Sequence, residues 1–456
     1  MNAPGTTKPV ALRYQDQRGL DEVPAYTTGL QLRLADGQQV YLALSNVEFA
    51  IHFSSEKVLH YDLTGRLEMI AETDCYQRRS LSHRVLLTRK LPREDGGGIA
   101  RMALPPAAAD MLVNEAQALA LIVHDALQRG TAILELAKPS ATTALHELRP
   151  HLDRAAQFDV RAAQLDARRF REVYGRVAVL PPDQYNALVV QATEGCAYND
   201  CLFCELYRGA RFQRKSPVQF RRHVEEVISY HGESLRARRS IFLGEANALT
   251  LPQADLVEML HVLHEHFELP APDQGQPPAS WWMGHPHRFD GLSSFQDAFA
   301  GPHRTTAQFA ELHRLGLRRV YIGMETGDDA LLKWLHKPAT HYSITQVVTA
   351  LKEANITVGV IVLLGAGGQQ FSATHIRESA RLINSLPLGR GDYIYFSPLE
   401  TTPCGHYDVK ALANGIHHLT DTELREQEAA IRAALRFDTK RGRPYLARYE
   451  LETFVY

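Results

Sequence analysis

Cysteine is scarce in this chain, which has 5 cysteines among 456 residues. So small and odd a number does not supply the disulfide framework that stabilises loop-rich secreted proteins. The cysteines are also unevenly spaced, because Cys196, Cys201 and Cys204 lie close together while Cys75 and Cys404 stand alone. We therefore expect free thiols in a reducing, cytoplasmic compartment, where thiolates are available as metal ligands.

The chain also lacks a long apolar run. Its most apolar stretch, residues 357–368, is too short to span a bilayer. The first residues contain no apolar core of signal-peptide length. The sequence therefore predicts a protein without a membrane segment.

Neither sign of charge is in excess. The 50 Lys and Arg residues nearly balance the 52 Asp and Glu residues, which gives a formal net charge of −2. A broad basic surface for nucleic acid is not expected, although a local basic patch stays open. With 45% hydrophobic and 22% charged residues, the composition is that of an ordinary globular protein.

The pattern of apolar and polar residues changes near residue 180, where two prolines in succession indicate a linker. Residues 1–180 read as strand hairpins followed by helices, and we expect an N-terminal α+β domain with a role in substrate recognition. Within it, segments 61–67 and 79–85 resemble each other and indicate two successive hairpins. We expect residues 181–400 to form the main domain and residues 401–456 a C-terminal helical extension.

Six short apolar segments in the main domain alternate with amphipathic helical patterns. This alternation predicts parallel strands joined by crossover helices. Six strand–helix units fit a partial (β/α)6 barrel of the TIM type, so the expected fold class is α/β. The segments are 187–192, 240–244, 280–284, 319–323, 357–364 and 393–397.

The three clustered cysteines directly follow the first of these strands. Loops at the C-terminal ends of barrel strands are where active sites form. Three neighbouring thiolates suit either zinc or an iron–sulfur cluster. Structural zinc usually takes four protein ligands, and no second Cys pair is present. A four-iron cluster held by three cysteines keeps one iron open for a small molecule.

This loop resembles that of the radical S-adenosylmethionine (SAM) superfamily. The usual pattern there is Cys-x-x-x-Cys-x-aromatic-Cys after the first barrel strand, and Cys201-Leu202-Phe203-Cys204 matches its second half. The first spacing departs from the pattern, because four residues separate Cys196 from Cys201. The variant Cys-x4-Cys-x2-Cys spacing leaves the subfamily unknown. The resemblance implies that Phe203 packs near the adenine of SAM.

Further correspondences follow in chain order over residues 185–400. Gly244-Glu245 after the second strand partly matches a Gly-Gly-Glu-like motif that binds the SAM amino group. Gly323-Met-Glu325-Thr-Gly is similar to a segment of the coproporphyrinogen-oxidase-like, methylthiotransferase and Elp-type branch, where a polar residue contacts the SAM ribose or carboxylate. Ile361 lies in the strand that flanks adenine in relatives. The resemblance does not reach residues 1–180.

The resemblance implies a [4Fe–4S] cluster on Cys196, Cys201 and Cys204, with SAM bound at the open iron. One electron then cleaves SAM into methionine and a 5′-deoxyadenosyl radical, which abstracts hydrogen from an unidentified substrate. An electron donor such as flavodoxin or ferredoxin is implied as a partner. Two rival readings stay open: a zinc-stabilised binding protein, and a cluster protein that senses SAM without turnover.

Candidate catalytic residues come from positions near the expected strand ends. His285 and His287 lie beyond the Trp-rich segment 280–284, which would place them on the active-site side as substrate contacts or proton carriers. Cys404 follows the sixth expected strand and is a candidate substrate-side thiol or second-cluster ligand. The sequence names no substrate, because one barrel supports many radical reactions.

Overall fold

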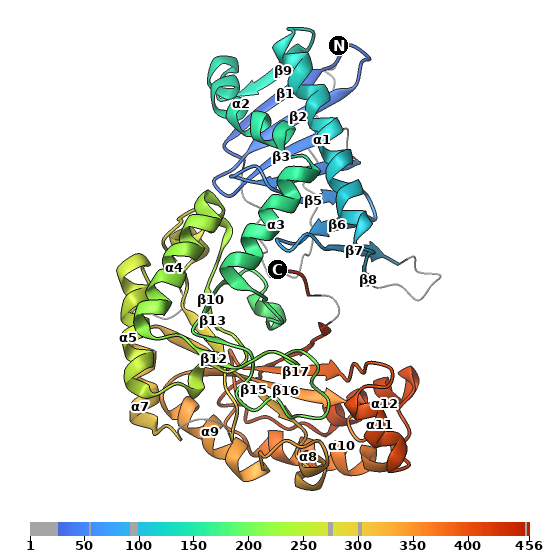
Figure 1. Ribbon diagram of the computed structural model, residues 1–456, viewed down its shortest axis with the longest axis vertical. Helices are drawn as coiled ribbons and strands as arrows, with labels where there is room; N and C mark the ends of the chain where they lie inside the picture. Colours follow the sequence, from blue (N-terminus) through green and yellow to red (C-terminus); the bar gives the residue numbers. More distant parts are fainter. Residues whose placement is uncertain (1–25, 54–55, 92–98, 272–276, 300–302, 452–453) are drawn as a thin grey trace.

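The computed structural model describes residues 26–53, 56–91, 99–271, 277–299, 303–451 and 454–456. In these ranges the chain forms two large β-sheets with helices packed on them (Figure 1). The first sheet is built from the N-terminal part of the chain, drawn in blue, and the second from the later part, drawn in green to red.

The first sheet has nine antiparallel strands within the described ranges, in the order β8-β7-β6-β5-β4-β3-β2-β1-β9. Consecutive hairpins build most of it, because each strand pairs with the next one in the chain. The predicted hairpins are therefore confirmed. The strands are β1 Thr28–Arg33, β2 Gln39–Leu44, β3 Glu48–Phe53, β4 Lys57–Asp62, β5 Leu67–Ala71, β6 Cys75–Arg79, β7 Val85–Lys90, β8 Ile99–Ala103 and β9 Ile133–Lys138.

Three helices accompany this sheet. Helices α1 (Ala107–Gln128) and α2 (Ala141–Gln157) bury their apolar sides against one face of it, and their Ala and Leu side chains share one core with the strands. Helix α3 (Val160–Tyr174) then runs from this sheet toward the second one (Figure 1). The predicted boundary near residue 180 falls between α3 and the first strand of the second sheet, and the division into domains stays a prediction.

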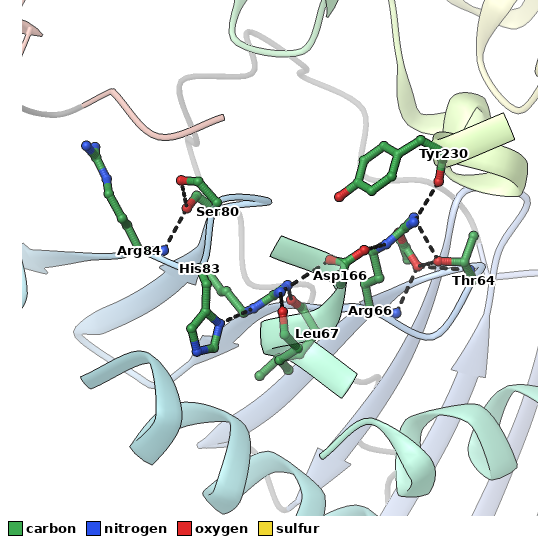
Figure 2. A network of polar contacts seen from close by, with 12 residues as sticks. Thr64, Arg66, Leu67, Ser80, His83, Arg84, Asp166 and Tyr230 are labelled. Atoms are coloured by element: carbon green, nitrogen blue, oxygen red, sulfur yellow. Dashed lines mark hydrogen bonds and ion pairs between the residues drawn. The ribbon is translucent and has the colours of Figure 1, made fainter. Parts of the chain in front are cut away.

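A charged network joins the first sheet to the helices beside it (Figure 2). Arg66, in the turn between β4 and β5, donates to Asp166 of α3 at 2.7 Å and to the Tyr230 carbonyl at 2.6 Å. Arg79, at the end of β6, donates to the other oxygen of Asp166 at 3.3 Å and to His83 at 3.1 Å. The two similar turns of the sequence thus meet at one carboxylate.

The second sheet has seven parallel strands in the described residues, in the order β10-β13-β14-β15-β16-β17-β18. Helices follow its strands in regular alternation, which confirms the α/β class and the partial TIM-type barrel. The strands are β10 Leu188–Gln191, β13 Ile241–Gly244, β14 Leu292–Phe295, β15 Leu317–Glu325, β16 Thr357–Leu364, β17 Tyr393–Pro398 and β18 Tyr445–Arg448.

The crossover helices match the amphipathic segments of the sequence. Several begin with a side-chain cap, such as Ser216 before α4 and Thr305 before α7, so their starts are fixed locally. The helices are α4 Pro217–His231, α5 Gln253–His266, α7 Thr306–Arg314, α8 Asp329–Trp334, α9 His341–Glu353 and α10 Gly368–Ser385.

One predicted strand is wrong. The Trp-rich segment 280–284 overlaps a short helix, α6 (Ala279–Trp282), that begins directly after Pro278. The third strand of the sheet is β14, whose sequence is Leu-Ser-Ser-Phe. Serine is not a strand-favouring residue, so this strand gave little signal in the sequence. It is held by its neighbours instead, and Ser294 donates to the Leu243 carbonyl at 2.8 Å.

Aromatic rings identify the inner face of the second sheet. Phe242 of β13 contacts Tyr321 of β15 with ring centroids 6.2 Å apart, although β14 lies between the two strands. Tyr321 also contacts Tyr395 of β17 at 6.4 Å, and its ring occupies the space beside Gly359 of β16. Rings from strands that are not neighbours meet here, so the sheet curves around this face.

The C-terminal region contains more than helices. Helices α11 (His406–Ala413) and α12 (Asp421–Ala434) form the helical part of this region, and α12 begins with a Thr420–Glu423 capping box. Strand β18 then adds to the parallel sheet beside β17. Among the described residues, no helix is both long and apolar enough to cross a membrane.

Candidate active site

The cysteine loop lies at the C-terminal end of β10, and its base is closed by a small strand pair. Strand β11 (Thr193–Glu194) leads into the loop and pairs antiparallel with β12 (Gln213–Arg214), which leads out of it. An ion pair between Glu194 and Lys215 reinforces this closure. Residues 195–212 are thereby held as a loop over the edge of the sheet where barrel active sites form.

Contacts with the segment after α8 fix the cysteine loop from the other side. The Leu202 amide donates to the Leu335 carbonyl at 2.9 Å, and the Tyr198 hydroxyl donates to the His336 carbonyl at 2.6 Å. Leu202 is buried in a small apolar cluster with Leu331 and Leu335. The loop is therefore packed on the end of β15 and the helix that follows it.

Cys196, Cys201 and Cys204 are free thiols and are partly buried. Burial raises the pKa of each, that of Cys201 to about 12, because a thiolate loses solvation there. The positive charge of Lys337 opposes this shift at all three. A bound metal would therefore be what keeps these sulfurs as thiolates, as is general for thiolate ligands.

The three thiols do not form a one-ion site. In the described part of the chain, no three His, Cys, Asp or Glu side chains make a group that could hold a single metal ion. A four-iron cluster does not require the three thiols to converge on one ion, because each thiolate binds a separate iron. Three thiols on one loop fit that arrangement in number and chemistry.

Glu245 follows β13 and connects it to the start of the cysteine loop. Its Oε2 accepts a hydrogen bond from the Gly195 amide at 2.8 Å, while its Oε1 is buried without a partner. Burial raises the pKa of this carboxyl to about 7. Gly244, the last residue of β13, accepts a hydrogen bond from the Ala192 amide at 2.8 Å.

Glu325 and Lys337 form a buried ion pair at the end of β15. Lys337 Nζ donates to Glu325 Oε1 at 2.8 Å, and the side chains are 4% and 9% exposed. Burial alone would lower the pKa of Lys337, but the carboxylates of Glu325 and Asp297 raise it on balance. The pair lies over Gly323, where a Cβ atom would overlap Glu325 Oε1 and lie 2.9 Å from Lys337 Nζ.

Asp297 is a second buried carboxyl beside Lys337. It lies just after β14 and accepts a hydrogen bond from Asn247 Nδ2 at 2.6 Å. Burial raises its pKa, and the charge of Lys337 opposes that rise. Two acids and one lysine therefore face one another at the C-terminal edge of β14 and β15.

The two predicted apolar contacts lie in the same region. The Phe203 ring is 6.0 Å from Lys337 Nζ and packs against the cluster that contains Leu202. Ile361 is half-buried in β16, and its register partners are Gly323 of β15 and Tyr395 of β17. The structure thus brings the cysteine loop, Phe203 and Glu325 together around Lys337, with Ile361 on the adjacent strand.

The histidine candidates lie elsewhere. Because 280–284 is not a strand, His285 and His287 precede β14 and belong to the opposite edge of the sheet. Both are exposed, and His287 stacks on Phe267 with centroids 6.4 Å apart. The expectation that they lie beyond the end of a barrel strand is wrong. Their proposed role as substrate contacts or proton carriers has no support from this position.

Cys404 is exposed and lies between β17 and α11, with a positive φ of 63°. The next residues approach the cysteine loop, since His406 Nδ1 lies 3.4 Å from Glu205 Oε1. Its role as a substrate-side thiol stays a prediction.

A comparison with protein-family models finds one family, the radical SAM superfamily, over residues 190–382. These residues form a radical SAM domain. Members of this superfamily bind a [4Fe–4S] cluster and SAM, which agrees with the resemblance read from the cysteine loop. The match covers less than half of the chain and leaves the subfamily open. No curated protein matches the chain in sequence.

Three of the solved structures similar to the chain are described as radical SAM enzymes. TsrM from Kitasatospora setae, a methyltransferase with cobalamin and a [4Fe–4S] cluster bound, is 15% identical with a TM-score of 0.35, over 50% of this chain and 37% of that one. A methyltransferase from Sphaerobacter thermophilus is 14% identical with a TM-score of 0.37, over 57% and 65%. Coproporphyrinogen III oxidase (HemN) from Escherichia coli is 13% identical with a TM-score of 0.36, over 58% and 55%.

The chain therefore spans well under half the length of TsrM and less than two thirds of the other two. Identities and TM-scores this low carry no information about substrate.

Three polar residues of the radical SAM domain were missed by the sequence reasoning: Asn247, Asp297 and Lys337. Asp297 follows the strand that was itself missed, so its place at a strand end was hidden. Lys337 precedes a proline after α8, and a single lysine there looks like a solvent-exposed residue. Its burial depends on contacts with β14 and β15 that no local pattern encodes.

Proposed function

We propose that the chain is a radical SAM enzyme that holds a [4Fe–4S] cluster on Cys196, Cys201 and Cys204 and cleaves SAM reductively. The resulting 5′-deoxyadenosyl radical would functionalise a substrate that the sequence does not name. The observation that carries the proposal is the cysteine loop: three free thiols over the C-terminal edge of a parallel sheet, inside a radical SAM domain.

The donor set fits the cluster and its open position. Three thiolates would hold three irons of the cluster, which would leave the fourth iron open to the amino and carboxylate groups of SAM. When bound and reduced, the cluster supplies the electron that breaks the carbon–sulfur bond of SAM. The buried ammonium of Lys337 offsets part of the negative charge that three thiolates bring into this region.

Several residues are positioned to bind SAM. The unpartnered Oε1 of Glu245 is an acceptor without a donor, which the α-amino group of SAM would supply. The second oxygen of Glu325 makes no hydrogen bond to the described residues and is available to a ribose hydroxyl. Phe203 and Ile361 offer apolar surface for the adenine ring.

The proposed enzyme also requires an electron donor and a substrate. A low-potential electron donor of the flavodoxin or ferredoxin type is required to reduce the cluster. We assign substrate recognition to residues 1–180, which lie outside the matched domain. Nucleic acid is not an expected substrate, because the net charge is only −2.

Metal analysis of anaerobically purified protein tests the cluster assignment. We expect a brown protein with roughly four irons per chain. Single Ala substitutions of Cys196, Cys201 and Cys204 should each lose the iron and the colour. Cys75→Ala is the matched control, because Cys75 is also a partly buried free thiol but lies in β6 of the first sheet. Stoichiometric zinc without iron would instead favour a zinc-stabilised binding protein.

A second assay separates an enzyme from a sensor. With SAM and a chemical reductant, the iron-loaded protein should release 5′-deoxyadenosine. Binding of SAM without any 5′-deoxyadenosine would identify a cluster protein that senses SAM and does not cleave it.

A further inference from the structure

A cavity of about 340 Å³ lies between the first sheet and the radical SAM domain. On the side of the first sheet it is lined by Asn46, from the turn between β2 and β3, and by Arg154 of α2. On the other side it is lined by Glu233 and Arg236 of the short 3-10 helix η3 (Gly232–Ala237). Small molecules bind preferentially in cavities at such junctions, so this cavity is a candidate second ligand site.

Contacts on both sides of the cavity hold its polar side chains in place. Asn46 lies against Gly284, where a Cβ atom would overlap the Asn46 amide group. Arg154 Nη1 donates to the Leu63 carbonyl, in the turn between β4 and β5, at 2.8 Å. Arg236 Nη1 donates to the Gly284 carbonyl, also at 2.8 Å. These positions are therefore set by the packing of the two parts of the chain against each other.

Donors outnumber acceptors in this cavity. The Asn46 side-chain amide hydrogen-bonds to none of the described residues. Arg154 makes its side-chain contacts through Nη1 alone, to Leu63 and to His151 Nδ1 at 3.5 Å, so its Nη2 has no partner in the described part of the chain. Arg236 uses its Nε and Nη1, and its Nη2 is left in the same state. A ligand with several acceptor oxygens would satisfy these three groups.

The charges of the lining favour an anion. Glu233 is the only carboxylate among the described lining residues, and its Oε2 already accepts a hydrogen bond from Arg236 Nε at 2.6 Å. Arg154 forms no ion pair with a described residue, so its positive charge is not compensated. His151 adds no charge near pH 7, because burial and then the positive charge of Arg154 lower its pKa.

A phosphate group matches these donors better than a carboxylate does. The donors come from three separate segments, the β2–β3 turn, α2 and η3, whereas a flat carboxylate has only two oxygens. A phosphate monoester presents three acceptor oxygens that do not lie in one plane, and guanidinium groups bind such oxygens with charge-assisted hydrogen bonds. Leu44 and Leu63 also line the cavity and offer apolar surface to the organic part of an ester.

The cavity lies apart from the cysteine loop. Helix η3 comes shortly before β13 in the chain, and Gly284 comes before β14. Both therefore belong to the N-terminal edge of the parallel sheet, whereas the cysteine loop follows β10 at the C-terminal edge. A ligand in this cavity would contact the first sheet and the radical SAM domain together, and it would not meet the proposed SAM site.

We propose that this cavity binds a small molecule through a phosphate group, held by Asn46, Arg154 and Arg236, and that the bound ligand links the first sheet to the radical SAM domain. The phosphate group is common to free phosphate and to a phosphate monoester, and the first experiment below separates these two sources. The inference does not depend on the function proposed above, because the site contains no residue assigned to the cluster or to SAM.

Calorimetric titration of the metal-free protein with inorganic phosphate, phenyl phosphate and benzoate tests the site. Both phosphate compounds should bind, and benzoate should bind about tenfold more weakly than phenyl phosphate, because it leaves a donor without an acceptor. Tighter binding of phenyl phosphate than of inorganic phosphate would identify a monoester as the ligand, and equal binding would identify free phosphate. Benzoate that binds as tightly as phenyl phosphate would overturn the assignment of a phosphate group.

Variants of the lining residues give the sharper test. Asn46→Asp adds a negative charge beside the phosphate and should weaken binding of phenyl phosphate at least about tenfold. Because the Asn46 amide has no hydrogen-bond partner in the described residues, this variant should keep the wild-type Tm without ligand. Arg154→Gln should also weaken binding about tenfold. Arg129→Gln, which replaces an exposed arginine outside the cavity, is the control and should bind like wild type. Absence of phosphate binding by the wild type, or binding that Asn46→Asp leaves unchanged, would overturn the proposal.

Hydrogen exchange of the metal-free protein with and without phenyl phosphate locates the bound ligand. Peptides that cover residues 44–47, 151–155 and 233–237 should all exchange more slowly with the ligand, because it contacts the three segments at once. Slower exchange on only one side of the cavity would contradict a ligand that links the two parts. Slower exchange confined to the cysteine loop, residues 195–212, would place the anion at the candidate active site and would overturn the proposal.

Discussion

Lys337 Nζ donates a hydrogen bond to Glu325 Oε1 at 2.8 Å, and the two groups meet over a glycine, Gly323. Both side chains are almost fully buried, so neither charge is screened by solvent. The pair joins the end of β15 to the segment after α8, on which the cysteine loop is packed. It therefore connects the proposed SAM site to the proposed cluster site.

Replacing only one partner of this ion pair should lower the free energy of unfolding. Lys337→Met leaves the Glu325 carboxylate buried without a counter-charge, and we expect a loss of about 3–5 kcal/mol in the free energy of unfolding. The double variant Lys337→Met/Glu325→Gln removes both charges and should lose less. Urea unfolding of the metal-free protein measures these two losses and that of the single variant Glu325→Gln. Strictly additive losses would contradict a direct interaction between the two groups.

Gly323 leaves no room for a side chain beneath the ion pair. A Cβ atom at Gly323 would overlap Glu325 Oε1, so Gly323→Ala must displace the pair. We expect a loss of about 1–3 kcal/mol, as for other insertions into packed interiors. The control is the same substitution in the Lys337→Met/Glu325→Ala background, where the space is vacated. A cost that is equal in both backgrounds, measured by urea unfolding, would mean that the backbone and not the pair requires glycine.

Acidic pH should destabilise the protein through His375. This histidine of α10 is buried, its Nδ1 lies 2.8 Å from Thr326 Oγ1, and burial lowers its pKa to about 4. Because the unfolded chain binds the proton near pH 6.5 and the folded chain does not, stability falls as pH drops from 6.5 to 4. His375→Gln should remove about 3 kcal/mol of this pH dependence.

Unfolding titrations at pH 7 and pH 4.5 measure the difference, with the exposed His417→Gln as control. A pH dependence that His375→Gln leaves unchanged would show that this histidine already binds its proton in the folded state.

The junction between the first sheet and its neighbouring helices depends on Asp166. Its carboxylate accepts hydrogen bonds from both Arg66 and Arg79, which are largely buried (Figure 2). Asp166→Asn should lower the free energy of unfolding by about 2–3 kcal/mol, because hydrogen bonds between charged groups are lost. Arg129→Ala removes an exposed ion pair with Asp125 and should have almost no effect. Similar losses in the two variants would contradict a buried network at this junction.

Much of the fold follows from local sequence patterns. The hairpins of the first sheet were predictable from short alternating segments with Gly-containing turns, and α12 from its Thr420–Glu423 cap. Strand β16 is a long apolar run, and β15 contains the shorter apolar segment 320–324. Strand β14 was not predictable, because Ser293 and Ser294 are buried only by their neighbours in the sheet. Trp281 and Trp282 favoured the prediction of a strand, but this segment forms a short helix after Pro278.

Some residues of the candidate site were likewise predictable from sequence and others were not. Cys196, Cys201 and Cys204 were predictable because three ligands on one loop lie close together in the sequence. Lys337 and Asp297 come from separate parts of the chain, and only the folded sheet brings them beside that loop. Their roles depend on burial and on contacts between distant segments, which are properties of the packed molecule.

The measurement that tests the central claim most directly is the yield of SAM cleavage products from anaerobically reconstituted protein. With SAM and a reductant, wild-type protein should release methionine and 5′-deoxyadenosine in equal amounts. Omitting the reductant, or replacing Cys204 with Ala, should abolish both products, whereas Cys75→Ala should not. Product formation that survives Cys204→Ala, or an iron-loaded wild-type protein that binds SAM and releases neither product, would contradict the account.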